Sequence, residues 1–143
     1  MLKKALLCAT LALAWLIAAR AQAQTQPHMF PVTGASGSVA AAPAIATLPA
    51  APGLTTFISG FEITASGASG ASCVTATVAG LVSGSLLYTF CAPAGVTAEA
   101  PALIVNFNPP IPAASVNTAI AVTLPSLGAG NTNATVATHG FQE

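Results

Sequence analysis

Two cysteines bracket a run of small, β-branched and aromatic residues, CVTATVAGLVSGSLLYTFC, at positions 73–91. The central LVSG is typical of a turn, so the flanking runs are expected to form an antiparallel hairpin. Placing Cys73 opposite Cys91 creates three further apolar pairs on one face: Val74–Phe90, Ala76–Tyr88 and Val78–Leu86. A register shifted by one residue would bury threonines instead. The apolar pattern and the cysteines therefore predict the same register.

The same register predicts a disulfide. Directly opposed Cα atoms of antiparallel strands lie about 4.5–5.5 Å apart, which is within the span of a disulfide. A redox or nucleophilic role would need a nearby cation to stabilise a thiolate. The basic residues are only Lys3, Lys4 and Arg20, all near the N-terminus, and the spacing is not C-x-x-C. We predict a structural disulfide between Cys73 and Cys91, with two free buried thiols as the alternative.

The chain beyond residue 43 repeats this kind of segment. Short runs rich in Val, Ile, Thr, Phe and Tyr are separated by Pro or Gly, and no run carries a long 3.6-residue apolar stripe. Prolines, among them Pro109, Pro110 and Pro112, are expected in the gaps between strands. Residues 43–143 are therefore predicted to form one all-β domain, a sandwich or barrel of antiparallel strands. The expected strands lie within residues 44–49, 54–65, 72–80, 85–92, 101–108, 118–125 and 134–141.

The N-terminal residues have the layout of a secretory signal peptide. Two lysines precede an apolar stretch at 5–19, and Ala21-Gln22-Ala23 offers a small-x-small cleavage site. An apolar stretch of this length rises only about 22 Å as a helix, less than the ~30 Å bilayer core, so an anchored helix is the weaker alternative. We expect residues 1–23 to be removed and residues 24–42 to form a flexible leader. The protein would be secreted, periplasmic or on the cell surface, without membrane attachment.

Charge excludes several classes of function. After signal removal the chain has no Lys, Arg or Asp, and its only acids are Glu62, Glu99 and Glu143. Binding to nucleic acid or anionic lipid depends on Lys and Arg, so neither partner is expected. A glycosidase would need two carboxylates in one cleft, and Glu62 and Glu99 are the possible pair.

A metal site is not expected within one chain. His139 and Glu143 provide too few ligands for a closed site, although copies of His139 could meet in a symmetric oligomer. We therefore expect no catalytic residue, no cofactor and no resident metal.

Three segments, TTFISGFEIT (55–64), PALIVNFNPPIPAAS (101–115) and NTAIAVTLPSLGAGNTNATVATHGF (117–141), resemble a group of known sequences. These are small Ala/Thr/Gly-rich proteins encoded in bacterial genomes and in phage or prophage structural regions. The resemblance covers residues 43–143 and implies a jelly-roll-like β-sandwich that self-associates, with a trimer favoured. It carries over no catalytic residues. The export signal departs from the phage pattern, because virion components assemble in the cytoplasm, and favours a bacterial extracytoplasmic protein.

The sequence thus predicts a secreted, non-enzymatic structural or surface-interaction protein that forms a homo-oligomer. Small neutral residues can pack against copies of themselves at little desolvation cost for charge. One alternative is a carbohydrate-binding or adhesin-type module with a surface glycan or envelope partner. Beyond the signal peptide, however, Tyr88 is the only Tyr and there is no Trp to stack on a sugar. The other alternative is an enzyme that uses Glu62 or Glu99.

Overall fold

The computed structural model describes residues 29–95, 102–131 and 133–143. The predicted signal peptide at 1–23 and Glu99 lie outside these residues. The described chain forms β-strands and no helix, so no described helix could cross a membrane. The strands are β1 (Phe30–Ala35), β2 (Ala44–Leu48), β3 (Thr56–Thr64), β4 (Ser72–Leu81), β5 (Gly84–Ala92), β6 (Ala102–Pro112), β7 (Ile120–Leu124) and β8 (Thr135–Gln142).

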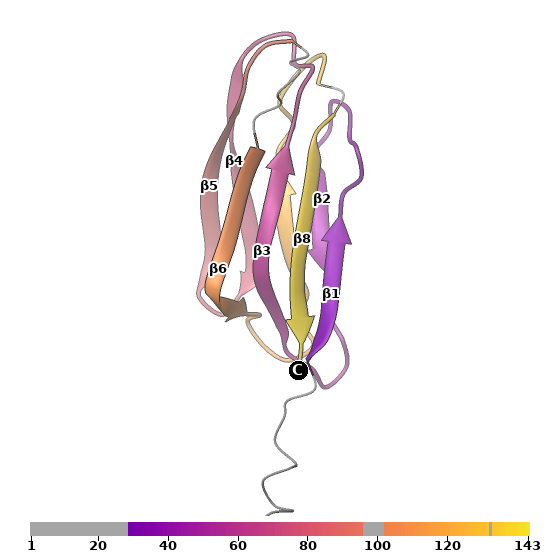
Figure 1. The fold of residues 1–143 in the computed structure, drawn as a ribbon, viewed down its shortest axis with the longest axis vertical. Helices are drawn as coiled ribbons and strands as arrows, with labels where there is room; N and C mark the ends of the chain where they lie inside the picture. The colour runs from indigo at the N-terminus through magenta and orange to yellow at the C-terminus, as the bar shows by residue number, and fades with distance from the viewer. Residues whose placement is uncertain (1–28, 96–101, 132) are drawn as a thin grey trace, which may run out of the picture.

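The strands form two packed sheets of four, in the orders β1-β8-β3-β6 and β2-β7-β4-β5 (Figure 1). Every strand pair is antiparallel. Successive strands alternate between the sheets except at the β4–β5 hairpin, which gives the two interleaved Greek keys of a jelly roll. The predicted antiparallel, jelly-roll-like sandwich is confirmed. β5 and β6 end their sheets on one side of the molecule, and β1 and β2 on the other.

The core lies between the sheets and follows the two-residue period of the strands. Inward side chains of β2, β3, β7 and β8 alternate with outward ones and are fully buried. Phe61 lies at the centre of the core. Its ring meets that of Tyr88 edge-on at a centroid distance of 5.2 Å, and it lies 6.2 Å from that of Phe107. These contacts join both sheets around one aromatic side chain.

The β4–β5 hairpin has the predicted register. Cys73 pairs with Cys91 and Val74 with Phe90, and the pairing continues to Val78 and Leu86. The apolar pairs face the core, whereas the cysteines and the Thr75–Thr89 pair are exposed on the outer face. Each strand runs one residue further than expected, so that Leu81 pairs with Gly84 across a tighter turn.

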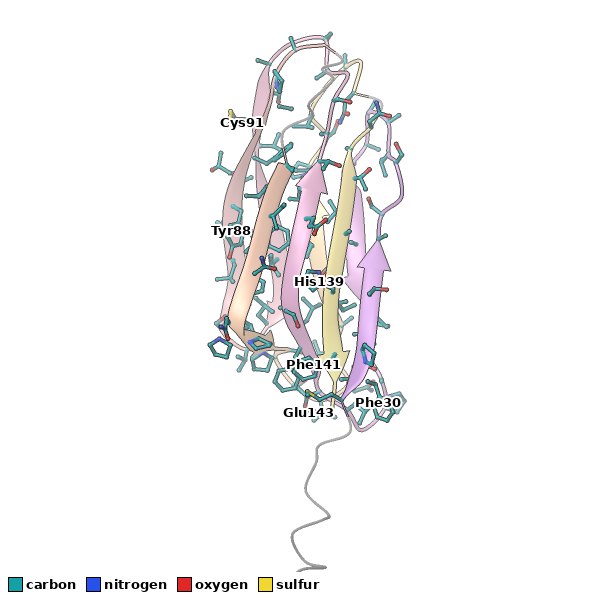
Figure 2. The ribbon with its side chains drawn as sticks, viewed as in Figure 1. Phe30, Tyr88, Cys91, His139, Phe141 and Glu143 are labelled. Carbon is teal, nitrogen blue, oxygen red and sulfur yellow. A yellow bond between two sulfur atoms is a disulfide. The ribbon has the colours of Figure 1, made fainter. Side chains whose placement is uncertain are left out.

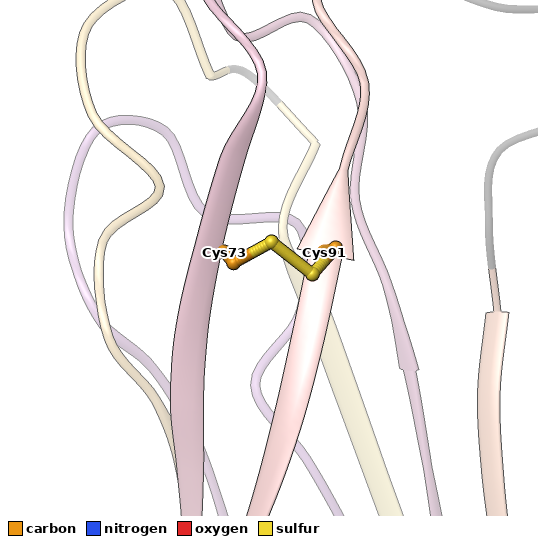
Figure 3. Close-up of a disulfide and its surroundings, with 2 residues drawn as sticks. All are labelled: Cys73 and Cys91. Carbon is orange, nitrogen blue, oxygen red and sulfur yellow. A yellow bond between two sulfur atoms is a disulfide. The ribbon is translucent and has the colours of Figure 1, made fainter.

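Cys73 and Cys91 form a disulfide across the hairpin (Figure 3). Their Cα atoms lie 4.0 Å apart, somewhat closer than the about 4.5–5.5 Å expected for residues opposed on neighbouring strands. Both cysteines are exposed, so the alternative of free buried thiols is not supported. The bond closes the end of the hairpin farthest from its turn.

The N-terminal boundary of the domain differs from the expectation. Residues 30–35 of the expected leader form β1, which pairs with β8 along its whole length. The apolar pattern here is weak because β1 lies close to β2: a Cβ on Gly34 would collide with the backbone of Thr47. Because β1 cannot carry a large side chain at this position, it joins the sheet through backbone pairing with β8. The folded domain therefore begins before residue 43.

Three prolines also lie in a different place from that expected. Pro109, Pro110 and Pro112 are within β6, not in the gap after it, and the Asn108–Pro109 peptide bond is cis. β6 is the last strand of its sheet and pairs with β3 alone. An edge strand tolerates proline because one of its sides has no ladder to break.

Candidate functional site

The outer face of the β1-β8-β3-β6 sheet gathers most of the described side chains that could bind a ligand. Its cross-strand registers align residues from all four strands in rows. Each row brings together residues that are far apart in the sequence. In the order β1, β8, β3, β6, the rows are Pro31–Phe141–Phe57–Pro112, Thr33–His139–Gly60–Asn106 and Ala35–Ala137–Glu62–Ile104.

The first row contains an aromatic pair. The rings of Phe57 and Phe141 are stacked, with centroids 4.9 Å apart and an angle of 7° between their planes. Both side chains point outward because their neighbours in β3 and β8, such as Thr56 and Gln142, are buried. Figure 2 shows Phe141 near the end of β8, one row below His139. The half-buried pair forms an apolar wall on this face.

The second row is centred on Gly60. A bulge between Ile58 and Gly60 shifts the register of β3 against both neighbours and turns Gly60 to the outer face. The buried Thr138 hydroxyl donates a hydrogen bond of 3.1 Å to the Gly60 carbonyl and holds the bulge in place. A Cβ on Gly60 would lie 2.5 Å from the Val105 carbonyl oxygen, 2.9 Å from His139 Nε2 and 3.0 Å from Asn106 Oδ1. These groups close over Gly60, which is buried.

His139 and Asn106 lean over Gly60 from the two neighbouring strands. His139 Nε2 and Asn106 Oδ1 are no more than about 6 Å apart, because each lies within 3.0 Å of the position that a Cβ of Gly60 would take. The two side chains cover the backbone of β3 here and leave no room for a further carbon atom. The Phe57–Phe141 pair lies in the preceding row, and Glu62 in the following row.

The polar groups of this face are available for binding. Among the described residues, no hydrogen bond or ion pair involves the side chains of His139, Asn106 or Glu62. Asn106 and Glu62 are exposed and His139 is half-buried. Such groups bond to water until a ligand replaces it, so the arrangement suits recognition of polar groups beside an apolar surface.

The structure does not bring together His139 and Glu143, the pair considered from the sequence for a metal site. Residues four positions apart along a strand lie about 13 Å apart, too far for His139 and Glu143 to share one ion. The Glu143 backbone instead exchanges hydrogen bonds of 2.8 and 3.2 Å with that of Thr55. Within the described residues, no three His, Cys, Asp or Glu side chains are grouped to hold a metal. The Glu62–Glu99 pair cannot be placed, because Glu99 lies outside the described residues.

Sequence reasoning identified Glu62 and His139 but missed Gly60, Asn106, Phe57 and Phe141 as members of one site. The local signal was present, since Phe57 and Phe141 occupy outward positions of alternating strands. Their meeting depends on the β3–β8 register, and the convergence of His139 and Asn106 over Gly60 depends on the bulge beside it. Neither can be read from the residues of one strand.

Comparison with known proteins finds no family model, curated protein or solved structure that matches this chain.

Proposed function

We propose that this protein is an exported, non-enzymatic structural protein that assembles with copies of itself through the β5–β6 side of the sandwich. One observation carries the proposal. The three most exposed large apolar side chains of the described residues are Leu87, Val82 and Ile104, which are 66%, 62% and 61% exposed. Leu87 is in β5, Ile104 is in β6, and Val82 is in the β4–β5 turn, where its N–H bonds to the Pro112 carbonyl of β6.

The core is also incompletely covered on this side. Leu86 and Tyr88 of β5, and Val105 and Phe107 of β6, are packed against the core but remain half-buried. On the opposite side Val32 of β1 is half-buried as well, whereas Ala44, Ala46 and Leu48 of β2 are fully buried. Both sheets end at β5 and β6, so no further strand of the described residues covers these side chains. A second copy placed here would complete the burial of these side chains, which favours association.

The edge strand β5 supports the same interface. Gly84–Ala92 contains neither proline nor a charged residue, and its outer edge has no partner strand among the described residues. Natural edge strands are usually protected by charge, proline, bulges or a covering segment. Pairing with a strand of another copy would also provide hydrogen-bond partners for the unpaired N–H and C=O groups of such an edge. Closed symmetry would limit the assembly to a defined oligomer, and the trimer implied by the sequence resemblance is its expected form.

The covalent structure supports the proposed location. A disulfide fits an extracellular or periplasmic protein, because the cytosol keeps thiols reduced. Together with the signal-like residues 1–23, it favours export followed by assembly outside the cytoplasm. Chemical analysis of the exported protein should find its N-terminus near Gln24, or at Gln22 if the earlier site is cleaved. Retention of Trp15 in the exported protein would contradict this.

Light scattering coupled to size exclusion tests the assembly. The exported protein at micromolar concentration should have a mass that is a small multiple of one chain, and Leu87→Glu should reduce it to one chain. Ile45→Glu is the matched control, since Ile45 is 51% exposed on the opposite edge strand β2. A wild-type monomer, or equal dissociation by both variants, would contradict the proposed interface.

A further inference from the structure

We infer that one end of the sandwich is a surface that inserts into a neutral lipid bilayer. This end, called the apolar end below, consists of residues 29–30, the β2–β3 loop (49–55), the β4–β5 turn (82–83) and the β6–β7 loop (113–119). Figure 2 shows it at the bottom, where Phe30 and Glu143 are labelled. Insertion by this end does not depend on the proposed self-association and applies to one chain as well as to an oligomer.

Four exposed large apolar side chains lie at this end. The described residues contain seven such side chains, and the four here, each between 50% and 62% exposed, are Met29, Phe30, Val82 and Val116. The loops of the opposite end, at 36–43, 65–71 and 125–131, contain none of the seven and consist mainly of Ser, Gly and Ala. The long axis of the molecule therefore runs from an apolar end to an end of small and polar residues (Figure 1).

Backbone hydrogen bonds hold the segments of the apolar end together. Phe30 is paired with Gln142, and Gln142 is also paired with Thr56 at the start of β3. Three further bonds, of 2.7, 2.9 and 3.1 Å, tie the loops to their neighbours: the N–H groups of Ala113, Asn117 and Val82 donate to the carbonyls of Thr56, Leu54 and Pro112, respectively. The four side chains project from this bonded backbone, so little further ordering of the chain opposes their insertion.

The apolar surface continues from this end onto the outer face of the β1-β8-β3-β6 sheet. The row nearest the end is Pro31–Phe141–Phe57–Pro112, which contains the two stacked phenylalanines. Pro31 is exposed, and the other three residues are half-buried. The surface is thus uneven, made of separate side chains that protrude from loops and strand ends. A fluid bilayer can accept such a surface because its acyl chains rearrange around each side chain.

The area of the end argues against a second copy as its partner. Four strands about 4.8 Å apart, in two sheets about 10 Å apart with side chains on both outer faces, give an end of roughly 20 Å by 20 Å, or about 400 Å². A stable interface between proteins buries about 800 Å² on each partner. Contact between two such ends would be too small for a stable dimer, whereas insertion into a bilayer needs no matching protein surface.

Charge favours a neutral bilayer. The apolar end contains no charged side chain, and Glu143, whose backbone is bonded to Thr55, is the only one next to it. An anionic lipid surface would repel this carboxylate, and no Lys or Arg of the described residues would offset the repulsion. A zwitterionic headgroup such as phosphocholine instead offers an ammonium group to Glu143. The sequence argued only against electrostatic attraction to anionic lipid, and insertion of apolar side chains does not need it.

The path of the chain brings this end to a membrane. The described chain starts at Met29, within the apolar end, and the apolar stretch at 5–19 precedes it in the sequence. Residues 20–28 connect the two, and nine residues span at most about 30 Å. On the export route proposed above, the apolar stretch enters the membrane first. The apolar end is then the part of the domain that is tethered closest to the bilayer.

A tryptophan placed at the apolar end tests insertion directly. Beyond the predicted signal peptide the chain has no Trp, so Val116→Trp provides a single reporter at this end, and Ile45→Trp provides one on the edge strand β2. Each exported variant is mixed with phosphatidylcholine vesicles. We expect the emission of Val116→Trp to shift to shorter wavelength and to be quenched by brominated acyl chains, and that of Ile45→Trp to stay unchanged. Neither change in Val116→Trp, or an equal response of both variants, would overturn the inference.

Sedimentation with vesicles measures the binding itself. Val116→Glu should weaken binding to phosphatidylcholine vesicles at least about tenfold, because a charge replaces an inserted apolar side chain. Ile45→Glu is the matched control, since Ile45 is exposed to a similar degree, and it should leave binding unchanged. Adding phosphatidylglycerol to the vesicles should not strengthen binding of the wild type. Stronger binding to the anionic vesicles, or equal effects of the two substitutions, would overturn the inference.

Two further measurements keep this inference apart from the proposed self-association. Leu87 is in β5, outside the apolar end, whereas Val82 borders both surfaces and is left unchanged. Vesicle binding that persists in Leu87→Glu supports the apolar end whatever the oligomeric state, and binding that is lost with the oligomer would overturn insertion by one chain. Val116→Glu should leave the mass measured by light scattering unchanged. Loss of the oligomer in this variant would show that the end contacts other copies, which would also overturn the inference.

Discussion

The rings of Phe57 and Phe141 stack on the outer surface of the sandwich, 4.9 Å apart between centroids. The pair joins the first half of β3 to the end of β8, the last strand of the chain. It lies outside the core, so its rings stay partly accessible while they also hold two strands together. This dual position links the stability of the sheet to the outer face of β3 and β8.

A double-mutant cycle should detect this contact. Phe57→Leu and Phe141→Leu keep most of the apolar surface but remove the stacking. We expect a coupling free energy of about 0.5–1.5 kcal/mol, which is the usual value for aromatic pairs beyond area burial. Urea denaturation of the wild type, both single variants and the double variant measures it. Strict additivity would show that the two rings contribute independently.

The disulfide should stabilise the hairpin measurably. Cys73 and Cys91 are 18 positions apart, and the chain-entropy model gives about 3 kcal/mol for a loop of this length. The Cys73→Ala/Cys91→Ala variant should lose about that free energy of unfolding and keep its β-sheet circular dichroism. Thr75→Ala/Thr89→Ala, at the next outward pair of the same hairpin, is the control and should lose far less. In the wild type, alkylation should modify neither cysteine before reduction.

The core face of the hairpin should be far more sensitive than its outer face. Phe90 is 3% exposed and packs in the core, so Phe90→Ala should cost about 3–5 kcal/mol. Thr75→Ala, on the exposed face of β4, should cost less than about 0.5 kcal/mol. Thermal or urea unfolding compares the two. Similar losses would mean that the hairpin faces the other way.

Gly34 should be required for β1 to dock. A Cβ at this position would collide with the Thr47 backbone, which cannot move without displacing β2. Gly34→Ala should therefore cost about 1–3 kcal/mol, the usual range for overpacking, and raise hydrogen exchange in β1. Gly70→Ala is the matched control, because nothing lies within 4 Å of its Cβ position and its φ is not positive. Equal stability of the two variants would place β1 elsewhere.

Features that depend on neighbours along the chain follow from the order of the residues alone. Seven of the strands, the β4–β5 register and the Cys73–Cys91 disulfide follow from alternation of apolar residues and from turn formers. The hairpin register and the disulfide can be predicted in this way because a short turn already holds the paired residues close together. The period of two then decides which side chains face the core.

The remaining features depend on how the strands pack together. β1 has too little apolar pattern to be recognised, and it exists because β8 offers a backbone ladder and β2 leaves room for Gly34 alone. His139, Gly60 and Asn106 come together from β8, β3 and β6 through registers between strands distant in sequence and through one bulge. A one-residue change in any of these registers would turn the side chains to the opposite face. Such registers result from the packing of the whole sandwich, which no single segment encodes.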